Sequence, residues 1–121
     1  MMNKKTLVLG ASTNAERYSF LAIKKLLAYH HTVVAIGLKK GQIDGVTIET
    51  DPIPYNDIDT ITLYINPSRQ IPYYNYIISL KPNRIIFNPG TENAALEKLA
   101  QQHHITTINA CTLVLLSTQQ Y

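Results

Sequence analysis

The stretch LVLGASTNAERYSF, residues 7–20, passes from a buried strand through a glycine into the start of a helix. Its first residues are continuously apolar, which is typical of a parallel strand that is covered on both faces. Gly10 permits a tight turn, and the small polar residues after it suit the entry into a helix. A strand, a glycine turn and a helix in this order predict the first half of a βαβ unit.

The same alternation continues along the chain and predicts an α/β protein: a parallel β-sheet with helices on both faces, in three layers. In the second helix, Ile71, Tyr74 and Ile78 mark the inward side, and Pro72 must lie in the first turn. We expect strands at residues 5–9, 32–37, 46–48, 60–65, 84–88 and 105–108, and helices at residues 17–29 and 68–80, with a third that is capped by Thr91 and ends near His103.

Length, charge and cysteine content limit the class of protein. The 121 residues fit one domain over residues 1–121, and the formal net charge is +3. The single cysteine, Cys111, cannot form an internal disulfide, and it is interpreted as a core thiol. The N-terminus lacks a signal-like segment, and no apolar run approaches the roughly 20 residues that cross a bilayer. We therefore expect a cytoplasmic protein without membrane contact.

In an open parallel sheet, ligands bind beyond the carboxyl ends of the strands. The turn at Gly10 offers backbone amides and a helix N-terminus to a phosphate; Ser12 and Thr13 add hydroxyl groups, and Arg17 adds a guanidinium group. A purely local need for glycine and a helix cap explains the turn about as well. The candidate site comprises four strand ends, at residues 10–18, 37–41, 64–67 and 88–92.

Two features separate this turn from the usual NAD-binding loop. Ser12 and Ala15 occupy the places of the second and third glycines of G-x-G-x-x-G. After the second strand, GLKKG replaces the acidic residue that holds the ribose of NAD. Lys39 and Lys40 suit a phosphate on the ribose, as in NADP or coenzyme A, although a solvated lysine pair is an equal alternative. The basic residues form pairs, which supports nucleic acid binding only weakly.

Several segments in collinear order carry a resemblance to a known family: VLGASTNAERYSF, VVAIGLKKGQIDGVTI, a long segment from ITLYINPSRQ to QQHHI, and NAC. The most specific pieces are Gly10, Ala11 and Ser12 with Asn14 and Arg17, and the segment NPGTEN at residues 88–93. The chain resembles the small stand-alone coenzyme A-binding domain proteins. These share the Rossmann-like fold of the coenzyme A-binding domain in the succinyl-CoA synthetase α subunit.

The resemblance implies a module that binds coenzyme A or an acyl-CoA across the strand ends. Two positions depart from the family pattern: Gly37 and Leu38 replace an Asn-Pro pair, and Phe87 and Asn88 replace Trp and Gln. The resemblance places Gly10, Ala11 and Ser12 at a phosphate, Asn14, Arg17 and Tyr18 beside it, Leu38, Lys39 and Lys40 at the adenine and ribose phosphate, Tyr64, Asn66 and Pro67 on the opposite wall, and Asn88, Pro89 and Gly90 at the pantetheine.

The sequence contains no recognisable catalytic or metal-binding constellation. The histidines come as two pairs at the expected helix ends, away from the ligand edge, and the carboxylates show no ligand spacing. We therefore interpret the chain as a binding domain without catalysis of its own. Two alternatives stay open: an NADP-binding reductase-like or epimerase-like domain, and a partner-binding module whose nucleotide cleft has decayed. The tyrosine-rich second helix and the apolar segment CTLVLL leave room for a homodimer.

Overall fold

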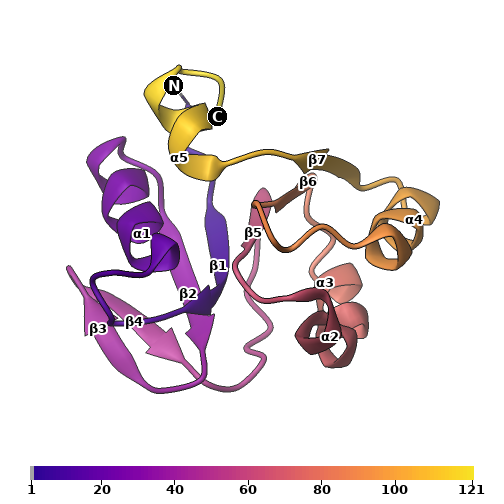
Figure 1. Ribbon diagram of the computed structural model, residues 1–121, viewed down its shortest axis with the longest axis horizontal. Coiled ribbons are helices and arrows are strands. Elements are labelled where there is room, and N and C mark those ends of the chain that lie inside the picture. Colours follow the sequence, from indigo (N-terminus) through magenta and orange to yellow (C-terminus); the bar gives the residue numbers. More distant parts are fainter. Residues whose placement is uncertain (1) are drawn as a thin grey trace.

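A computed structural model describes residues 2–121, and within them seven strands form one sheet (Figure 1). The strands are β1 (Thr6–Ala11), β2 (Val33–Gly37), β3 (Gly41–Ile43), β4 (Val46–Glu49), β5 (Thr60–Leu63), β6 (Arg84–Phe87) and β7 (Thr106–Asn109). Their order across the sheet is β3-β4-β2-β1-β5-β6-β7. Every neighbouring pair is parallel except the β3–β4 hairpin at one edge.

Helices cover both faces of this sheet. They are α1 (Tyr18–Ala28), α2 (Pro67–Gln70), the 3₁₀ helix η1 (Ile71–Tyr73), α3 (Tyr74–Ser79), α4 (Ala94–Gln102) and α5 (Thr112–Ser117). Figure 1 shows α1 and α5 on one side of the sheet and α2, α3 and α4 on the other. The predicted three-layer, Rossmann-like α/β fold is therefore confirmed. Among the described helices, none is both long enough and apolar enough to cross a membrane.

The central strand β1 explains why the opening stretch is continuously apolar. Leu7, Val8 and Leu9 are each at most 1% exposed. Leu7 and Leu9 belong to the core under α3 and α4, whereas Val8 belongs to the core under α1 and α5. A strand that packs against helices on both faces has no polar side, so the alternation of a half-exposed strand is absent.

The β3–β4 hairpin was not predicted in full, since only a strand at residues 46–48 was expected. Asp44 and Gly45 both have positive φ, at 47° and 86°. Two such residues form the type of tight turn that joins antiparallel strands, and an Asp-Gly pair is a strong sequence signal for it. The short strands on either side, only three and four residues long, concealed the hairpin among the neighbouring loops.

The helix expected over residues 68–80 is broken into α2, η1 and α3. Pro72 lies inside η1, where it cannot donate the backbone hydrogen bond that a continuous α-helix needs. The tighter 3₁₀ turn shifts the helical phase. The expected inward position of Ile71 is wrong: this side chain is 60% exposed, and Ile77 is the fully buried residue. Tyr74 and Ile78 are partly buried against the core, as expected.

Two smaller expectations at the carboxyl-terminal half also change. Helix α4 begins at Ala94, and its N-cap is Asn93, whose side chain accepts a hydrogen bond from the Leu96 N–H at 3.1 Å. Thr91 is therefore not the cap; its hydroxyl donates to the Asn88 carbonyl oxygen at 2.8 Å. The apolar segment CTLVLL contributes most of α5, which packs beside α1.

Candidate functional site

The turn after β1 brings three strand ends into unusually close contact. Gly10 has φ +103°, and the pairing of β1 with β2 shifts register at this residue. A Cβ on Gly10 would lie 2.8 Å from Ile65 Cγ2 and 2.9 Å from the backbone carbon of Tyr64. A Cβ on Gly37 would collide with the carbonyl oxygen of Ala11. Glycine is therefore required at both strand ends, and the backbone itself forms the floor of the site.

The loop between β1 and α1 is held by its own polar atoms. Ser12 Oγ accepts a hydrogen bond from the Asn14 N–H at 3.1 Å, and Asn14 Oδ1 accepts one from the Glu16 N–H at 3.0 Å. The Asn14 carbonyl oxygen accepts from the Arg17 N–H at 3.0 Å. These three hydrogen bonds give Asn14 a structural role in the loop, in addition to its predicted contact with a ligand.

Helix α1 begins without a side-chain cap. Arg17 occupies the N-cap position, and within the described chain the backbone N–H groups of Tyr18 and Ser19 donate to no acceptor. The first turn contains no acidic residue. The Arg17 cation lies at the positive end of the helix dipole, where a positive charge destabilises the helix. Free donors together with a guanidinium group form a favourable environment for an anion.

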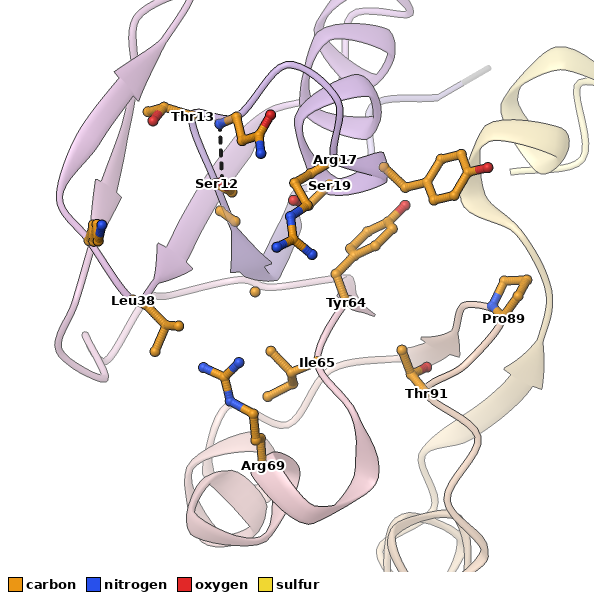
Figure 2. A pocket seen from close by; sticks show the side chains of 15 residues that line it. Ser12, Thr13, Arg17, Ser19, Leu38, Tyr64, Ile65, Arg69, Pro89 and Thr91 are labelled. Carbon is orange, nitrogen blue, oxygen red and sulfur yellow. Dashed lines mark hydrogen bonds between the residues drawn. The ribbon is translucent and has the colours of Figure 1, made fainter.

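Above this turn lies a cavity of about 600 Å³, within the roughly 300–1,000 Å³ usual for small-molecule sites. It opens where the strand order reverses beside β1 and collects residues that follow β1, β2, β5 and β6 (Figure 2). The lining residues are Gly10, Ala11, Ser12, Thr13, Asn14, Arg17, Tyr18, Ser19, Leu38, Lys39, Tyr64, Ile65, Arg69, Pro89 and Thr91.

The cavity brings together most of the residues expected at a ligand. Gly10, Ala11, Ser12, Asn14, Arg17, Tyr18, Leu38, Lys39, Tyr64 and Pro89 line it, whereas Lys40, Asn66, Pro67, Asn88 and Gly90 do not. Whether the first group contacts a ligand stays a prediction. Sequence reasoning missed Ser19 and Arg69 as wall residues, whereas Ile65 and Thr91 lie within the expected strand ends but were not singled out.

The charge of the cavity has one sign. Arg17, Lys39 and Arg69 line it, and none of the described lining residues is Asp or Glu. Figure 2 shows the guanidinium groups of Arg17 and Arg69 pointing into the cavity from opposite walls. Among residues 2–121, the only ion pair found joins Lys24 and Asp44, away from this site. The cationic groups are thus available to an anionic ligand.

Asn66 and Pro67 shape the wall that carries Arg69. Asn66 is the N-cap of α2: its Oδ1 accepts hydrogen bonds from the Arg69 N–H at 3.1 Å and from Ser68 Oγ at 2.6 Å. Pro67 occupies the first helical position, where a missing N–H costs nothing. Both residues therefore act on the cavity through the backbone of α2.

A buried amide joins this wall to the loop after β6. Gln70 is fully buried, and its Nε2 donates to the carbonyl oxygens of Ile65 at 2.9 Å and Thr91 at 2.8 Å. Its Oε1 accepts from Asn93 Nδ2 at 2.8 Å. The α2 segment and the NPGTEN loop are consequently fixed to each other, with Arg69 and Thr91 on the same rim.

Asn88 is a structural residue in this arrangement. Its side chain is buried; Nδ2 donates to Thr62 Oγ1 at 2.6 Å and to the Leu63 carbonyl oxygen at 2.9 Å. Its Oδ1 accepts from the Thr112 N–H at 2.9 Å. These bonds tie β5, the end of β6 and α5 together, which leaves the Asn88 amide little capacity for a ligand.

The described lining of the cavity offers hydrogen-bond donors, and its titratable groups are arginine, lysine and tyrosine side chains. Burial raises the pKa of Tyr64 to about 12, against the opposing effect of the nearby Thr112 and Thr62 hydroxyl groups, so Tyr64 is protonated at neutral pH. Its hydroxyl oxygen is buried without a hydrogen-bond partner in the described chain. Among the described lining residues none is Asp, Glu, His or Cys. Likewise, residues 2–121 contain no cluster of three His, Cys, Asp or Glu side chains that could hold a metal ion.

The most buried histidine lies far from this chemistry. His31 follows α1, its Nδ1 accepts a hydrogen bond from the Lys4 N–H at 2.9 Å, and its ring lies 4.9 Å from that of Tyr121. Burial lowers the pKa of His31, the cations Lys4 and Arg84 lower it further, and Asp59 opposes them. His31 is therefore a neutral packing residue at pH 7.

Known proteins share this sequence pattern and this fold. A family model described as "CoA binding domain" matches residues 4–117. No curated protein matches the chain. The crystal structure of an uncharacterized protein is 45% identical over 100% of both chains, with a TM-score of 0.97.

Two more distant structures show the fold alone. A hypothetical protein from Pyrococcus horikoshii OT3 is 23% identical over 96% of this chain and 83% of its own, with a TM-score of 0.86. An acetyl-coenzyme A synthetase from Ca. Korarchaeum cryptofilum, in complex with phosphate and ADP, is 14% identical over 88% of this chain and 25% of its own, with a TM-score of 0.70.

Proposed function

This chain belongs to the family of CoA binding domains, and on that premise we propose that its cavity binds coenzyme A or an acyl-CoA. The observation that carries the proposal is a cavity with three cationic side chains and no carboxylate among its described lining residues. Coenzyme A carries a diphosphate and a 3′-phosphate, so it supplies several negative charges along one extended molecule. A site without a carboxylate avoids repulsion with every one of them.

The turn after β1 is the candidate diphosphate site. The glycine at position 10 lets the backbone approach closely, and the uncapped amides of Tyr18 and Ser19 are free donors at the positive end of α1. Arg17 adds a charge-assisted contact of the kind that phosphate oxygens accept from guanidinium groups. Ser12 contributes a hydroxyl from the same loop.

Apolar surface beside the cations suits the uncharged parts of the ligand. Leu38 is 73% exposed at the end of β2, and Tyr18 is 70% exposed at the start of α1. Large apolar side chains that face solvent at the rim of a cavity are typical of binding sites. We assign Leu38 to the adenine side and the rim at Pro89 and Thr91 to the pantetheine side.

We further propose that the domain binds without catalysing a reaction. The lack of Asp, Glu, His and Cys among the described lining residues supports this, since general acid–base and nucleophilic chemistry both need such a group near the ligand. NADP is the second candidate ligand, because Lys39 at the end of β2 suits any phosphate on a ribose.

Isothermal titration calorimetry with coenzyme A, acetyl-CoA, NADP and NAD tests the proposal. We expect saturable binding of coenzyme A and acetyl-CoA, and weaker or undetectable binding of NADP and NAD. Preference for NADP would favour the second candidate, and no heat with any of the four ligands would refute both.

A pair of variants tests the location. Ser12→Asp places a carboxylate in the turn and should abolish coenzyme A binding while the fold survives. Ser117→Asp adds the same charge beside Lys25, outside the cavity, and should leave binding unchanged. Equal affinity of the wild type and Ser12→Asp would refute the assignment of the turn.

A further inference from the structure

Arg69 lines the cavity but belongs neither to the turn after β1 nor to the lysine pair at the end of β2, so the proposed function has not yet given it a role. We infer that Arg69, together with Lys39, forms a second anion subsite that recognises the 3′-phosphate on the ribose of coenzyme A. This inference rests on the proposed function and goes beyond it, because it names the residue that determines ligand specificity. Arg69 lies on α2, and its side chain points into the cavity from the wall opposite Arg17 (Figure 2).

Among residues 2–121, the guanidinium group of Arg69 has no partner. Within the described chain it takes part in no hydrogen bond and no ion pair, and the side chain is exposed. An arginine that points into a cavity beside other cations is unfavourable in the empty protein, because like charges repel. Arg17 and Lys39 line the same cavity, so the arrangement favours a ligand with more negative charge than one diphosphate carries.

The position of Arg69 beside the end of β2 indicates which phosphate of coenzyme A it would bind. A small, mainly apolar pocket, too small for a phosphate, shares Arg69 and Leu38 with the main cavity and also contacts Gly37, so Arg69 lies beside the end of β2. In doubly wound α/β domains the ribose of a bound nucleotide lies at the end of the second strand, where a basic residue accommodates a ribose phosphate. Arg17 lies at the start of α1, beside the diphosphate turn. The two arginines therefore serve two different phosphates.

The backbone under Arg69 is rigid, so the guanidinium group projects from a fixed base. Asn66 caps the Arg69 N–H at 3.1 Å, and the adjacent Gln70 is fully buried with its amide bonded to two carbonyl oxygens. A fixed base reduces the conformational entropy that is lost when the side chain binds. Gln70 is in this sense a positioning residue for Arg69.

The test compares coenzyme A with dephospho-coenzyme A, which lacks only the 3′-phosphate, in calorimetric titrations of four proteins. These are the wild type, Arg69→Gln, Arg17→Gln and Lys98→Gln; the last removes the same charge from an exposed position on α4, outside the cavity. The wild type should bind coenzyme A roughly tenfold to hundredfold more tightly than dephospho-coenzyme A, as a charge-assisted hydrogen bond allows.

Arg69→Gln should weaken coenzyme A by most of that factor, since Lys39 remains, and leave dephospho-coenzyme A unchanged. Arg17→Gln should weaken both ligands by a similar factor, and Lys98→Gln should weaken neither. If Arg69→Gln weakens both ligands equally, or neither, while the wild type binds coenzyme A, the assignment of Arg69 is wrong and the proposed function stands. If the wild type binds neither ligand, the proposed function fails and the inference fails with it.

Discussion

Replacing Arg17 by Asp should stabilise the protein and abolish its binding of coenzyme A. Arg17 is the N-cap of α1 with φ −81° and ψ 141°, the extended conformation that capping residues adopt, yet its side chain makes no capping bond. An Asp carboxylate at this position can accept a hydrogen bond from the free Ser19 N–H. It also replaces a cation by an anion at the positive end of the helix dipole.

The size of the gain follows from these two effects. A good N-cap contributes about 1 kcal/mol relative to a residue that does not cap. The charge reversal adds a few tenths of a kcal/mol, taken at the low end because Arg17 is exposed and its charge is screened. With an unfolding entropy of about 0.25 kcal/mol/K for a chain of this length, the melting temperature should rise by about 4–6 °C.

Differential scanning calorimetry measures the melting temperature, and titration with coenzyme A measures the affinity. We expect Arg17→Asp to melt higher than the wild type and to lose at least about a hundredfold in affinity, since a charge-assisted contact becomes a repulsion. Arg17→Ala is the matched control: it should also bind weakly, but without the thermal gain. A lower melting temperature for Arg17→Asp, or unchanged affinity, would contradict the description of this turn.

Three further changes test other parts of the structure. Gly37→Ala should destabilise the protein by roughly 2–3 kcal/mol in urea unfolding, because the new Cβ collides with the Ala11 carbonyl oxygen; wild-type stability would show that the strand ends can separate. Gln70→Leu should cost roughly 2–4 kcal/mol and also weaken coenzyme A binding, since it leaves the Thr91 carbonyl oxygen without its partner; unchanged binding would disprove the positioning role. The free energy of unfolding should fall as the pH drops below about 6.5, because His31 takes up a proton more readily in the unfolded chain than in the folded one. His31 contributes at most about 1.4 kcal/mol per pH unit to this fall. In pH-dependent urea unfolding the fall should be smaller for His31→Gln, and an equal fall in both proteins would exclude His31 as its source.

The layers of the fold were predictable because they depend on local pattern. The apolar run at β1 and the similar runs at β5 and β6 could be buried only in a sheet that is covered on both faces. The turn at Gly10 was predictable for the same reason, since a backbone with φ +103° requires glycine. The cavity at the carboxyl ends of the strands followed from the parallel order.

The differences from the prediction have two causes: local signals that were not used, and contacts between residues distant in sequence. One helix was predicted over residues 68–80 although Pro72, a local signal, lies in its η1 segment, and the preceding α2 carries Arg69 at the cavity. The bonds of the Asn88 amide to Thr62 and Thr112, which are far away in the sequence, were not predicted, and the expected contact of Asn88 with the ligand stays a prediction. The residues near Asn88 in the sequence give no signal that predicts these long-range hydrogen bonds. The homodimer and the cytoplasmic location stay predictions.

The most direct test of the central claim is a crystal structure of the protein grown with saturating coenzyme A. The account predicts electron density for the ligand in the cavity, with the diphosphate against the turn after Gly10 and the 3′-phosphate beside Arg69. Coenzyme A bound at the opposite edge of the sheet, or a cavity that contains no ligand under these conditions, would contradict it.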